Sequence, residues 1–481
     1  MNYVTLLKKQ AEEKADIPYI ILHDRQITYR QAYEDARRFV LPEWERQFPQ
    51  QYKTSVLIVS AGVYHQLLAF LAVMAAGQIP VIGHYDLPEA AQNRLVAQNR
   101  IGFILAETEN GWMLKQGAAE PAVAGEAATK GPSGQAAHAN EEKDDFDNGA
   151  SSFVPAQAPY QNACMGVLSS GSTDAPKVMY RTYESWAGFI PEQNRRFCID
   201  EKAVVFAEGS FSFTGNLSIW ASVLYAGCTL VVSESFRCRQ WLELIWTHRV
   251  SVLYLVPAKL KALTRYLDRA YPAMRMILAG SQLLGAKTAE TLKEHFPNSE
   301  IILYYGASEL DYITWLSYEE MLRYPDSVGR PVPGVQVWVE NGLIYIDTPY
   351  HVEGLQQPCT LHDTGWFNDE GYLIFNGRES DIINKGGFKI SCTKIENALC
   401  SLPDVTQAVV LPYDDAGRGQ EAAAFVTGGP ELIKQELRLR LRDVLMPQEM
   451  PKKLVLLREI PLNSRGKTDK AALKKLLEEK L

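Results

Sequence analysis

Residues 55–82, SVLIVSAGVYHQLLAFLAVMAAGQIPVI, set a helical pattern between two short apolar runs. The runs 55–60 and 79–82 are rich in Val and Ile, which favours buried strands. Residues 64–76, between them, have the spacing of a helix with an apolar face. A strand, a helix and a second strand in this order predict a parallel sheet covered by helices.

The same alternation continues towards the C-terminus. Further strand-like runs lie at 229–232, 252–256, 276–279 and 301–304, and a helical pattern lies at 286–296. Residues 116–159 differ, because they are rich in Ala, Gly, Ser, Glu and Asp and predict a flexible surface insertion. We therefore predict an α/β fold with a large multi-layer N-terminal region, residues 1–379, built on parallel and mixed sheets.

The pattern of strand-like and helical segments changes after about Gly377. Strand-like runs at 405–411, 422–426 and 454–457 are combined with helical patterns at 431–445 and 471–481. This pattern predicts a small mobile α+β domain over residues 380–481, of a size that can fold alone.

Composition excludes several classes of protein. The chain has 481 residues, 46% of them hydrophobic, and a net charge of −8, so neither a disordered chain nor a general nucleic-acid binder is expected. The seven cysteines include no CxxC spacing, which argues against a disulfide framework or a zinc site. Residues 56–83 are interrupted by polar side chains, and the start of the chain lacks signal-peptide features. A cytoplasmic protein without a membrane span is therefore expected.

The segment LSSGSTDAPK, residues 168–177, has the chemistry of a phosphate-binding loop. Gly171 lets the backbone approach a ligand, hydroxyl side chains can donate hydrogen bonds, and Lys177 adds a positive charge. The spacing is not that of a Walker A loop. Taken alone, such a segment is more often an ordinary loop.

Four further segments follow it along the chain: YYGASE (304–309), LHDTG (361–365), NGRESDIINKGGFKI (376–390) and PLNSRGKTDK (461–470). Together, in this order and spacing, the five segments resemble the signature motifs of the adenylate-forming superfamily. That superfamily includes acyl-CoA synthetases, stand-alone adenylation domains of peptide synthetases, and luciferases. The resemblance covers nearly the whole chain and implies the superfamily's fold, with a mobile C-terminal domain.

The resemblance also implies roles for individual residues. The nucleotide-binding set is Ser169, Ser170, Gly171, Ser172, Thr173, Lys177, Tyr305, Ser308, Asp363 and Arg378. The catalytic and metal-binding set is Lys467, which would contact the carboxylate and α-phosphate, and Glu309, which would hold Mg²⁺. The remaining set is Phe213, Gly280 and Gly306 in the acyl pocket, Gly386 and Gly387 in the thiol tunnel, and Ser380 as the hinge.

The reaction that the resemblance implies has two steps. A carboxylic acid and ATP would give an acyl-adenylate and pyrophosphate, and a thiol would then give a thioester and AMP. The implied cofactors are ATP, Mg²⁺ and CoA. A nearby aromatic face suits the purine of ATP, and a carboxylate suits Mg²⁺ beside phosphates.

The acid is indicated by residues 204–219, VVFAEGSFSFTGNLSI. Amino-acid-activating relatives usually carry Phe-Asp here, whereas in this chain Phe213 is followed by Thr214. A buried ammonium without a carboxylate partner would be costly, which argues against an α-amino acid and leaves fatty or aryl acids open. The alternative is that Phe206, Phe211 and Phe213 are ordinary core residues of a strand.

Three functions therefore remain in view. The favoured one is an AMP-forming acyl-CoA synthetase. The second is an adenylation enzyme that loads a phosphopantetheinyl carrier protein. The third is a non-catalytic relative that binds nucleotide, which is motivated by Asp174, His362 and Ser380 at places where the motifs usually carry other residues.

Overall fold

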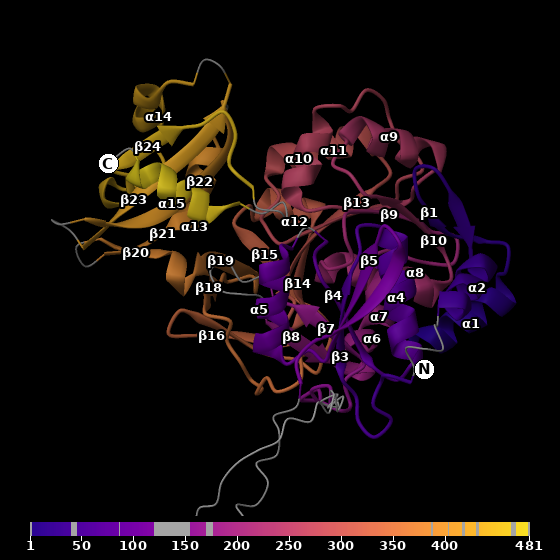
Figure 1. The fold of residues 1–481 in the computed structure, drawn as a ribbon. Helices are drawn as coiled ribbons and strands as arrows, with labels where there is room; N and C mark the ends of the chain where they lie inside the picture. The colour runs from indigo at the N-terminus through magenta and orange to yellow at the C-terminus, as the bar shows by residue number, and fades with distance from the viewer. Residues whose placement is uncertain are drawn as a thin grey trace, which may run out of the picture.

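The structure is a computed structural model that describes residues 2–39, 46–85, 87–119, 154–169, 177–385, 388–402, 404–415, 419–429, 432–462 and 468–479. The chain folds into a large lobe and a smaller C-terminal lobe, which is coloured orange to yellow (Figure 1). The large lobe contains two sheets and the small lobe contains a third. The predicted α/β fold class is confirmed.

The stretch 55–82 lies in a six-stranded sheet. Its two apolar runs form β3 and β4, which pair in parallel with Val56 opposite Pro80, and β3 also pairs in parallel with β5. The strand order is β6 (Gly111–Gln116), β5 (Phe103–Thr108), β3 (Ser55–Val59), β4 (Ile79–Ile82), β7 (Met165–Leu168) and β8 (Val178–Arg181). The strand–helix–strand prediction is thus correct, with α4 (Val63–Ala75) as the connecting helix.

The second sheet has thirteen strands. Its middle, from β1 through β10, β9, β11 and β12 to β13, is parallel, and the pairs beyond β13 are antiparallel. The strand order is β16 (Gln336–Glu340), β17 (Leu343–Asp347), β18 (Asp363–Phe367), β19 (Leu373–Arg378), β15 (Ser327–Pro331), β14 (Asp311–Ser317), β13 (Glu300–Ala307), β12 (Met276–Gly280), β11 (Val252–Tyr254), β9 (Val204–Glu208), β10 (Thr229–Ser233), β1 (Pro18–Ile21) and β2 (Gln26–Thr28). The predicted mixture of parallel and antiparallel pairing is therefore present.

Helices cover these two sheets. In the large lobe they are α1 (Tyr3–Glu13), α2 (Tyr29–Phe39), α4, α5 (Glu89–Asn99), α6 (Tyr183–Ala187), α7 (Ile190–Arg196), α8 (Thr214–Ala226), α9 (Cys238–Thr247), α10 (Pro257–Thr264), α11 (Ala286–His295) and α12 (Tyr318–Arg323). Most residues of α4 and α8 are buried, and both helices belong to one hydrophobic cluster that also includes residues of the two sheets. A helix that is apolar on nearly every side is one that lies inside the core.

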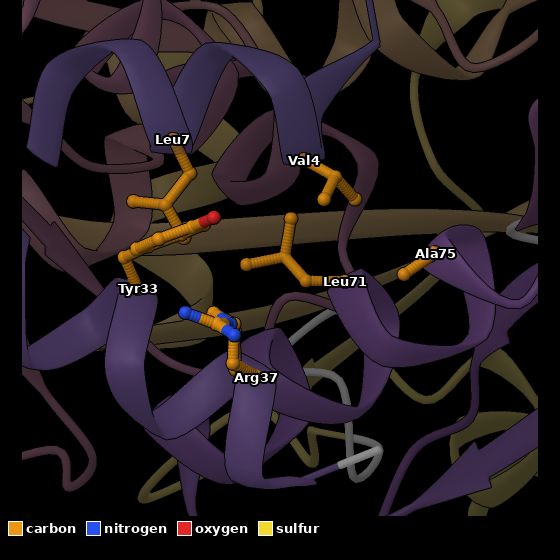
Figure 2. Close-up of a pocket in the computed structure, with 7 residues that line it drawn as sticks. Val4, Leu7, Tyr33, Arg37, Leu71 and Ala75 are labelled. Carbon is orange, nitrogen blue, oxygen red and sulfur yellow. The ribbon is translucent and has the colours of Figure 1, made fainter. Parts of the chain in front are cut away.

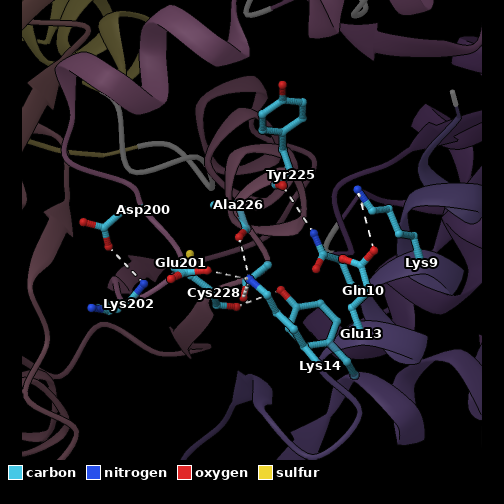
Figure 3. A network of polar contacts seen from close by, with 12 residues as sticks. Lys9, Gln10, Glu13, Lys14, Asp200, Glu201, Lys202, Tyr225, Ala226 and Cys228 are labelled. Carbon is cyan, nitrogen blue, oxygen red and sulfur yellow. Dashed lines mark hydrogen bonds and ion pairs between the residues drawn. The ribbon is translucent and has the colours of Figure 1, made fainter.

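The C-terminal end of α8 is held by side chains from α1 (Figure 3). Gln10 donates from Nε2 to the carbonyl oxygens of Leu224 and Tyr225, at 3.2 and 3.3 Å. Lys14 donates from Nζ to the carbonyl oxygens of Ala226 and Gly227, at 3.1 and 3.0 Å. These are among the carbonyl groups that a helix leaves without partners at its end, and a cation there also suits the helix dipole.

The small lobe is a sheet with helices on both faces. Its elements are β20 (Ile382–Lys385), β21 (Phe388–Ser391), α13 (Cys392–Cys400), β22 (Val405–Asp415), β23 (Gly419–Gly428), α14 (Lys434–Leu441), the short helix η2 (Pro447–Glu449), β24 (Lys453–Leu456) and α15 (Lys470–Glu478). Val410 packs in the cluster that contains α13 and α14, whereas its neighbours Val409 and Leu411 pack in the cluster that contains α15. This alternation is the period of two expected of a strand that is covered on both faces.

Two expectations need correction. The ends of the predicted insertion 116–159 belong to the fold, because Gln116 ends β6 and Ala156 and Ala158 are buried; residues 120–153 lie outside the described residues. The helix predicted at 431–445 is shorter, because α14 spans only Lys434–Leu441. Leu445 lies beyond its end and still packs in the lobe's core together with Leu441. No helix among the described residues is long and apolar enough to cross a bilayer.

Candidate active site

Tyr305 and Asp363 meet at the carboxyl edge of the thirteen-stranded sheet. Tyr305 lies near the end of β13, Asp363 begins β18, and the Tyr305 hydroxyl donates a hydrogen bond to Asp363 Oδ2 at 2.5 Å. The Tyr305 ring also packs against Phe375 of β19, with the ring centroids 5.6 Å apart. The carboxyl ends of strands are where open α/β sheets usually bind ligands.

The second oxygen of Asp363 retains its capacity to accept. Asp363 is only 4% exposed, and Oδ1 is buried without a hydrogen-bond partner in the described structure. Arg378, opposite Asp363 on β19, brings Nε to 3.4 Å from Oδ1, which makes an ion pair without a hydrogen bond. Burial raises the pKa of Asp363, while Tyr305 and Arg378 lower it. A buried acceptor of this kind calls for a donor from a ligand.

Arg181 connects the two sheets near this edge. It ends β8, is completely buried, and donates to the carbonyl oxygens of Ser308 at 2.7 Å and Tyr350 at 2.8 Å. Burial lowers the pKa of its guanidinium, and the carboxylates of Asp311 and Glu309 act in the opposite direction. Arg181 therefore holds the turn that carries Ser308 and Glu309 against the β7–β8 hairpin.

The Ser308 side chain reaches the beginning of α8. Its Oγ lies 2.8 Å from Oγ1 of Thr214, the first residue of that helix, and either hydroxyl can donate. Glu309 follows Ser308 and is half-buried, and no described residue donates a hydrogen bond to its carboxylate. Two hydroxyl groups and a helix N-terminus thus lie together at the turn that also carries Glu309, and groups of these kinds suit a phosphate with its counter-ion.

The predicted phosphate loop closes a hairpin. Strands β7 and β8 are antiparallel, and at their ends Lys177 N donates to Ser169 Oγ while Ser169 N donates to the Lys177 carbonyl oxygen, both at 2.9 Å. Lys177 is exposed. The residues between them that the sequence singled out, Ser170, Gly171, Ser172 and Thr173, lie outside the described residues.

The predicted hinge lies between the two lobes. Ser380 is within the short helix η1 (Glu379–Asp381). On one side, Glu379 N donates to the His362 carbonyl oxygen at 2.7 Å, and its carboxylate lies 3.1 Å from His362 Nδ1. On the other side, Asp381 accepts from Lys470 of α15 at 2.8 and 2.9 Å. Gly386, Gly387 and Lys467 lie outside the described residues.

His362 keeps the backbone conformation of the turn before β18. Its φ is 59°, in the left-handed region, where the motif usually carries Gly. Histidine tolerates this region better than most side chains do. The turn into β18 is therefore kept, and Asp363 still begins the strand.

The predicted acyl-pocket residues lie near the turn that carries Ser308 and Glu309. Phe213 is the N-cap of α8 and packs edge-on against His84, with the ring centroids 5.5 Å apart. Gly280 ends β12, and Gly306 lies opposite Tyr312 in the β13–β14 hairpin, where a Cβ would overlap the Asp311 carbonyl oxygen. Of the three phenylalanines that the alternative placed along one strand, Phe206 alone lies on β9; Phe211 is buried in the turn after it, and Phe213 is half-buried.

Sequence reasoning did not identify Arg181 as part of this site and did not assign a contact to Thr214. A buried arginine is uncommon, so nothing in the local pattern distinguishes Arg181 from a surface residue. A small apolar hollow between α1, α2 and α4 lies elsewhere and contains none of the predicted residues (Figure 2). It is lined by Val4, Leu7, Tyr33, Ala36, Arg37, Leu71 and Ala75.

Comparison with known proteins agrees with this arrangement. The family model described as AMP-binding enzyme matches residues 7–347, and the model of the AMP-binding enzyme C-terminal domain matches residues 394–467. An uncharacterised acyl-CoA ligase of Bacillus subtilis, YhfT, is 28% identical over 352 residues, which are 70% of this chain and 73% of that protein. Enterobactin synthase component E of Escherichia coli is 24% identical over 95% of this chain and 91% of that protein.

Solved structures share the fold. o-Succinylbenzoate CoA synthetase (MenE) from Bacillus subtilis, in complex with an acyl-adenylate intermediate, has a TM-score of 0.78 at 19% identity and covers 98% of this chain and 97% of its own. ATP-bound MatB from Rhodopseudomonas palustris has a TM-score of 0.78 at 18% identity, with 99% of both chains covered.

The chain belongs to the AMP-binding enzyme family. As the sequence motifs predicted, this is an enzyme family of the ligase type, and the relatives of this chain include proteins named as acyl-CoA ligases.

Proposed function

We propose that this protein activates a carboxylic acid with ATP to an acyl-adenylate, releasing pyrophosphate, and then transfers the acyl group to CoA, releasing AMP. The observation that carries the proposal is Oδ1 of Asp363, a buried acceptor without a hydrogen-bond partner beside Tyr305. An aspartate that accepts from ribose hydroxyls is a common solution to nucleoside binding. The family assignment supports an enzyme that handles an adenylate.

The nucleoside would lie against Tyr305. The Tyr305 hydroxyl already occupies Oδ2 of Asp363, which leaves Oδ1 for a ribose hydroxyl. Arg378, which is 59% exposed at its side chain, can donate to the same sugar. The Tyr305 ring, which is half-buried and packs against Phe375, would stack on the purine.

The phosphates would lie at the turn formed by Ser308 and Glu309. Mg²⁺ usually takes one or two carboxylates together with phosphate oxygens and water. Glu309 offers such a carboxylate, and the described residues contain no group of three ligands that would form a cage made of protein alone. When bound, Mg²⁺ supplies positive charge that neutralises the triphosphate. Ser308, Thr214 and the hairpin that ends in Ser169 and Lys177 would hold the phosphates in position.

The small lobe would act as a lid. We place the boundary between core and lid at residues 379 and 380, with Ser380 as the hinge, Lys467 as the catalytic cation, and Gly386 and Gly387 in the thiol tunnel. Support comes from the tethers on either side of Ser380, since Glu379 is bonded to the core and Asp381 to α15. Closure of a lid of this kind excludes water from a reactive mixed anhydride.

The test is pyrophosphate exchange into ATP, measured with a panel of fatty and aryl acids and repeated for thioester formation with CoA or with a phosphopantetheinyl carrier protein. Acid-dependent exchange followed by acyl-CoA formation is expected. Transfer to the carrier alone would favour the carrier-loading function instead. Nucleotide binding without exchange for any acid would overturn the proposal in favour of a non-catalytic relative.

A further inference from the structure

Two tyrosine hydroxyls meet over the end of β12. Tyr254 ends β11, and Tyr304 lies on β13 directly opposite Gly280 of β12. Because β12 lies between these two strands, the side chains approach each other across it, and their hydroxyl oxygens are 3.0 Å apart. The two rings lie at 20° to one another, with their centroids 6.5 Å apart.

Each tyrosine tip fills space beside a glycine. A Cβ built on Gly280 would overlap Cζ of Tyr304, and a Cβ built on Gly215 would overlap the hydroxyl oxygen of Tyr254. Gly215 is the second residue of α8, so the tyrosine pair lies between the beginning of that helix and the end of β12. Glycine is needed at both places because the tyrosine tips approach the backbone closely.

The Tyr254–Tyr304 pair, which we call the plug, lies next to the turn that carries Ser308 and Glu309. The Thr214–Ser308 hydroxyl pair joins the beginning of α8 to the turn after β13, and the Tyr254–Tyr304 hydroxyl pair joins β11 to β13, with the Tyr254 hydroxyl against Gly215 of α8. Thr214 and Gly215 are consecutive, and consecutive Cα atoms are about 3.8 Å apart. An acyl group that starts beside Thr214 and Ser308 therefore meets the tyrosine tips after a short distance.

The plug is also firmly packed. Tyr254 is 6% exposed. The Tyr304 ring packs edge-on against Tyr312 of β14, with the centroids 4.7 Å apart. A buried aromatic ring with neighbours this close does not move aside without opening a cavity, which is unfavourable.

We propose that the Tyr254–Tyr304 pair closes the acyl pocket and makes this enzyme selective for short-chain carboxylic acids, with long-chain acids excluded. The inference rests on the proposed function and narrows it from fatty or aryl acids to acids of the size of acetate, propionate and butyrate. Tyr304 is then a specificity-determining residue, because its ring occupies the space next to Gly280 that a longer acyl chain would need.

The test compares straight-chain acids from acetate to dodecanoate in the pyrophosphate-exchange assay. The wild-type chain is expected to have its highest kcat/KM with acids up to butyrate and at least tenfold less with octanoate. Tyr304→Leu, which shortens the side chain but keeps an apolar group against Tyr312, is expected to shift the optimum to longer acids by at least tenfold in relative kcat/KM. Tyr254→Phe keeps the ring volume and is expected to retain the length limit.

Binding gives a readout that does not depend on turnover. Calorimetry with the non-reactive propionyl and decanoyl sulfamates of adenosine is expected to give tight binding of the first alone in the wild-type chain, and of both in Tyr304→Leu. Equal wild-type preference for short and long ligands would overturn the plug, as would an unchanged length profile in a folded Tyr304→Leu variant. Absence of exchange with every acid, while these adenosine ligands still bind by length, would count against the proposed function alone.

Discussion

The hydroxyl of Tyr305 lies 2.5 Å from Oδ2 of Asp363, although 58 positions separate the two residues in the chain. The hydrogen bond joins the end of β13 to the beginning of β18, two strands that are not neighbours in the sheet. It fixes the buried carboxylate so that Oδ1, the oxygen without a hydrogen-bond partner, is the one left for a ligand.

Replacing Asp363 with Asn should weaken nucleotide binding. The variant keeps the size of the side chain but loses the negative charge, and its amide nitrogen, in place of one carboxylate oxygen, can only donate and cannot accept a hydrogen bond. Hydrogen bonds to charged groups contribute about 1.5–3 kcal/mol, so Kd for ATP should rise about tenfold or more. Calorimetric titration with ATP measures this directly. Asp369→Asn, at an exposed aspartate in the β18–β19 turn, is the matched control and should leave Kd unchanged.

Lys467→Ala should separate the two half-reactions. If Lys467 neutralises charge as the carboxylate attacks the α-phosphate, its removal should reduce acid-dependent pyrophosphate exchange by about 100-fold or more, as loss of a charge-stabilising group does in other active sites. A preformed acyl-adenylate should still react with CoA at nearly the wild-type rate. Lys474→Ala, at an exposed lysine of α15, serves as the control. Equal loss of both half-reactions would remove Lys467 from this role.

The half-buried Glu396 should make the small lobe less stable at alkaline pH. Burial raises the pKa of Glu396 from 4.5 to about 7, against the opposing effects of the Val410 N–H and Lys470. Its folded pKa lies above its unfolded value, so its contribution to stability is fully present below pH 4.5 and is lost as the pH rises to about 7.

Glu396→Gln should therefore matter only on the alkaline side. Glutamine can still accept the hydrogen bond from Val410 N without becoming charged. The variant should be more stable than the wild-type chain by about 2–3 kcal/mol at pH 8 and by little at pH 5. Hydrogen exchange of the β22 and β23 amides at the two pH values measures the difference. Glu459→Gln, at an exposed glutamate, should show none, and a gain in Glu396→Gln that is independent of pH would contradict the argument.

The sequence patterns predicted the strands of the sheets because their apolar runs are buried on both faces, as in 55–60 and 276–279. The ends of elements were less predictable, because tertiary packing, and not the local pattern, determines where α14 ends and where β6 ends at Gln116. The motifs indicated Tyr305 and Asp363 only through resemblance, because no local spacing predicts a contact across 58 positions.

Other parts of the site depend on tertiary structure alone. Only the folded structure identifies Arg181 as part of the site. There its burial and its hydrogen bonds to the Ser308 and Tyr350 carbonyl oxygens distinguish it from a surface arginine. The same holds for Tyr254 and Tyr304. Each resembles an ordinary residue at the end of an apolar strand until the fold brings the two hydroxyls together over Gly280.

The interface between α1 and α8 should control both stability and the position of Thr214. Gln10→Leu would leave the buried carbonyl oxygen of Leu224 and the partly buried one of Tyr225 without their donor, which should lower the free energy of unfolding by about 2 kcal/mol. Because Thr214 begins the same helix, KM for the acid should also rise. Urea unfolding and pyrophosphate exchange measure the two effects. Lys9→Met removes an exposed side chain of α1 whose ion pair with Glu13 spans 3.9 Å, and should change stability by less than about 0.5 kcal/mol. If Gln10→Leu proved as mild as Lys9→Met, the carbonyl groups at the end of α8 would not depend on α1.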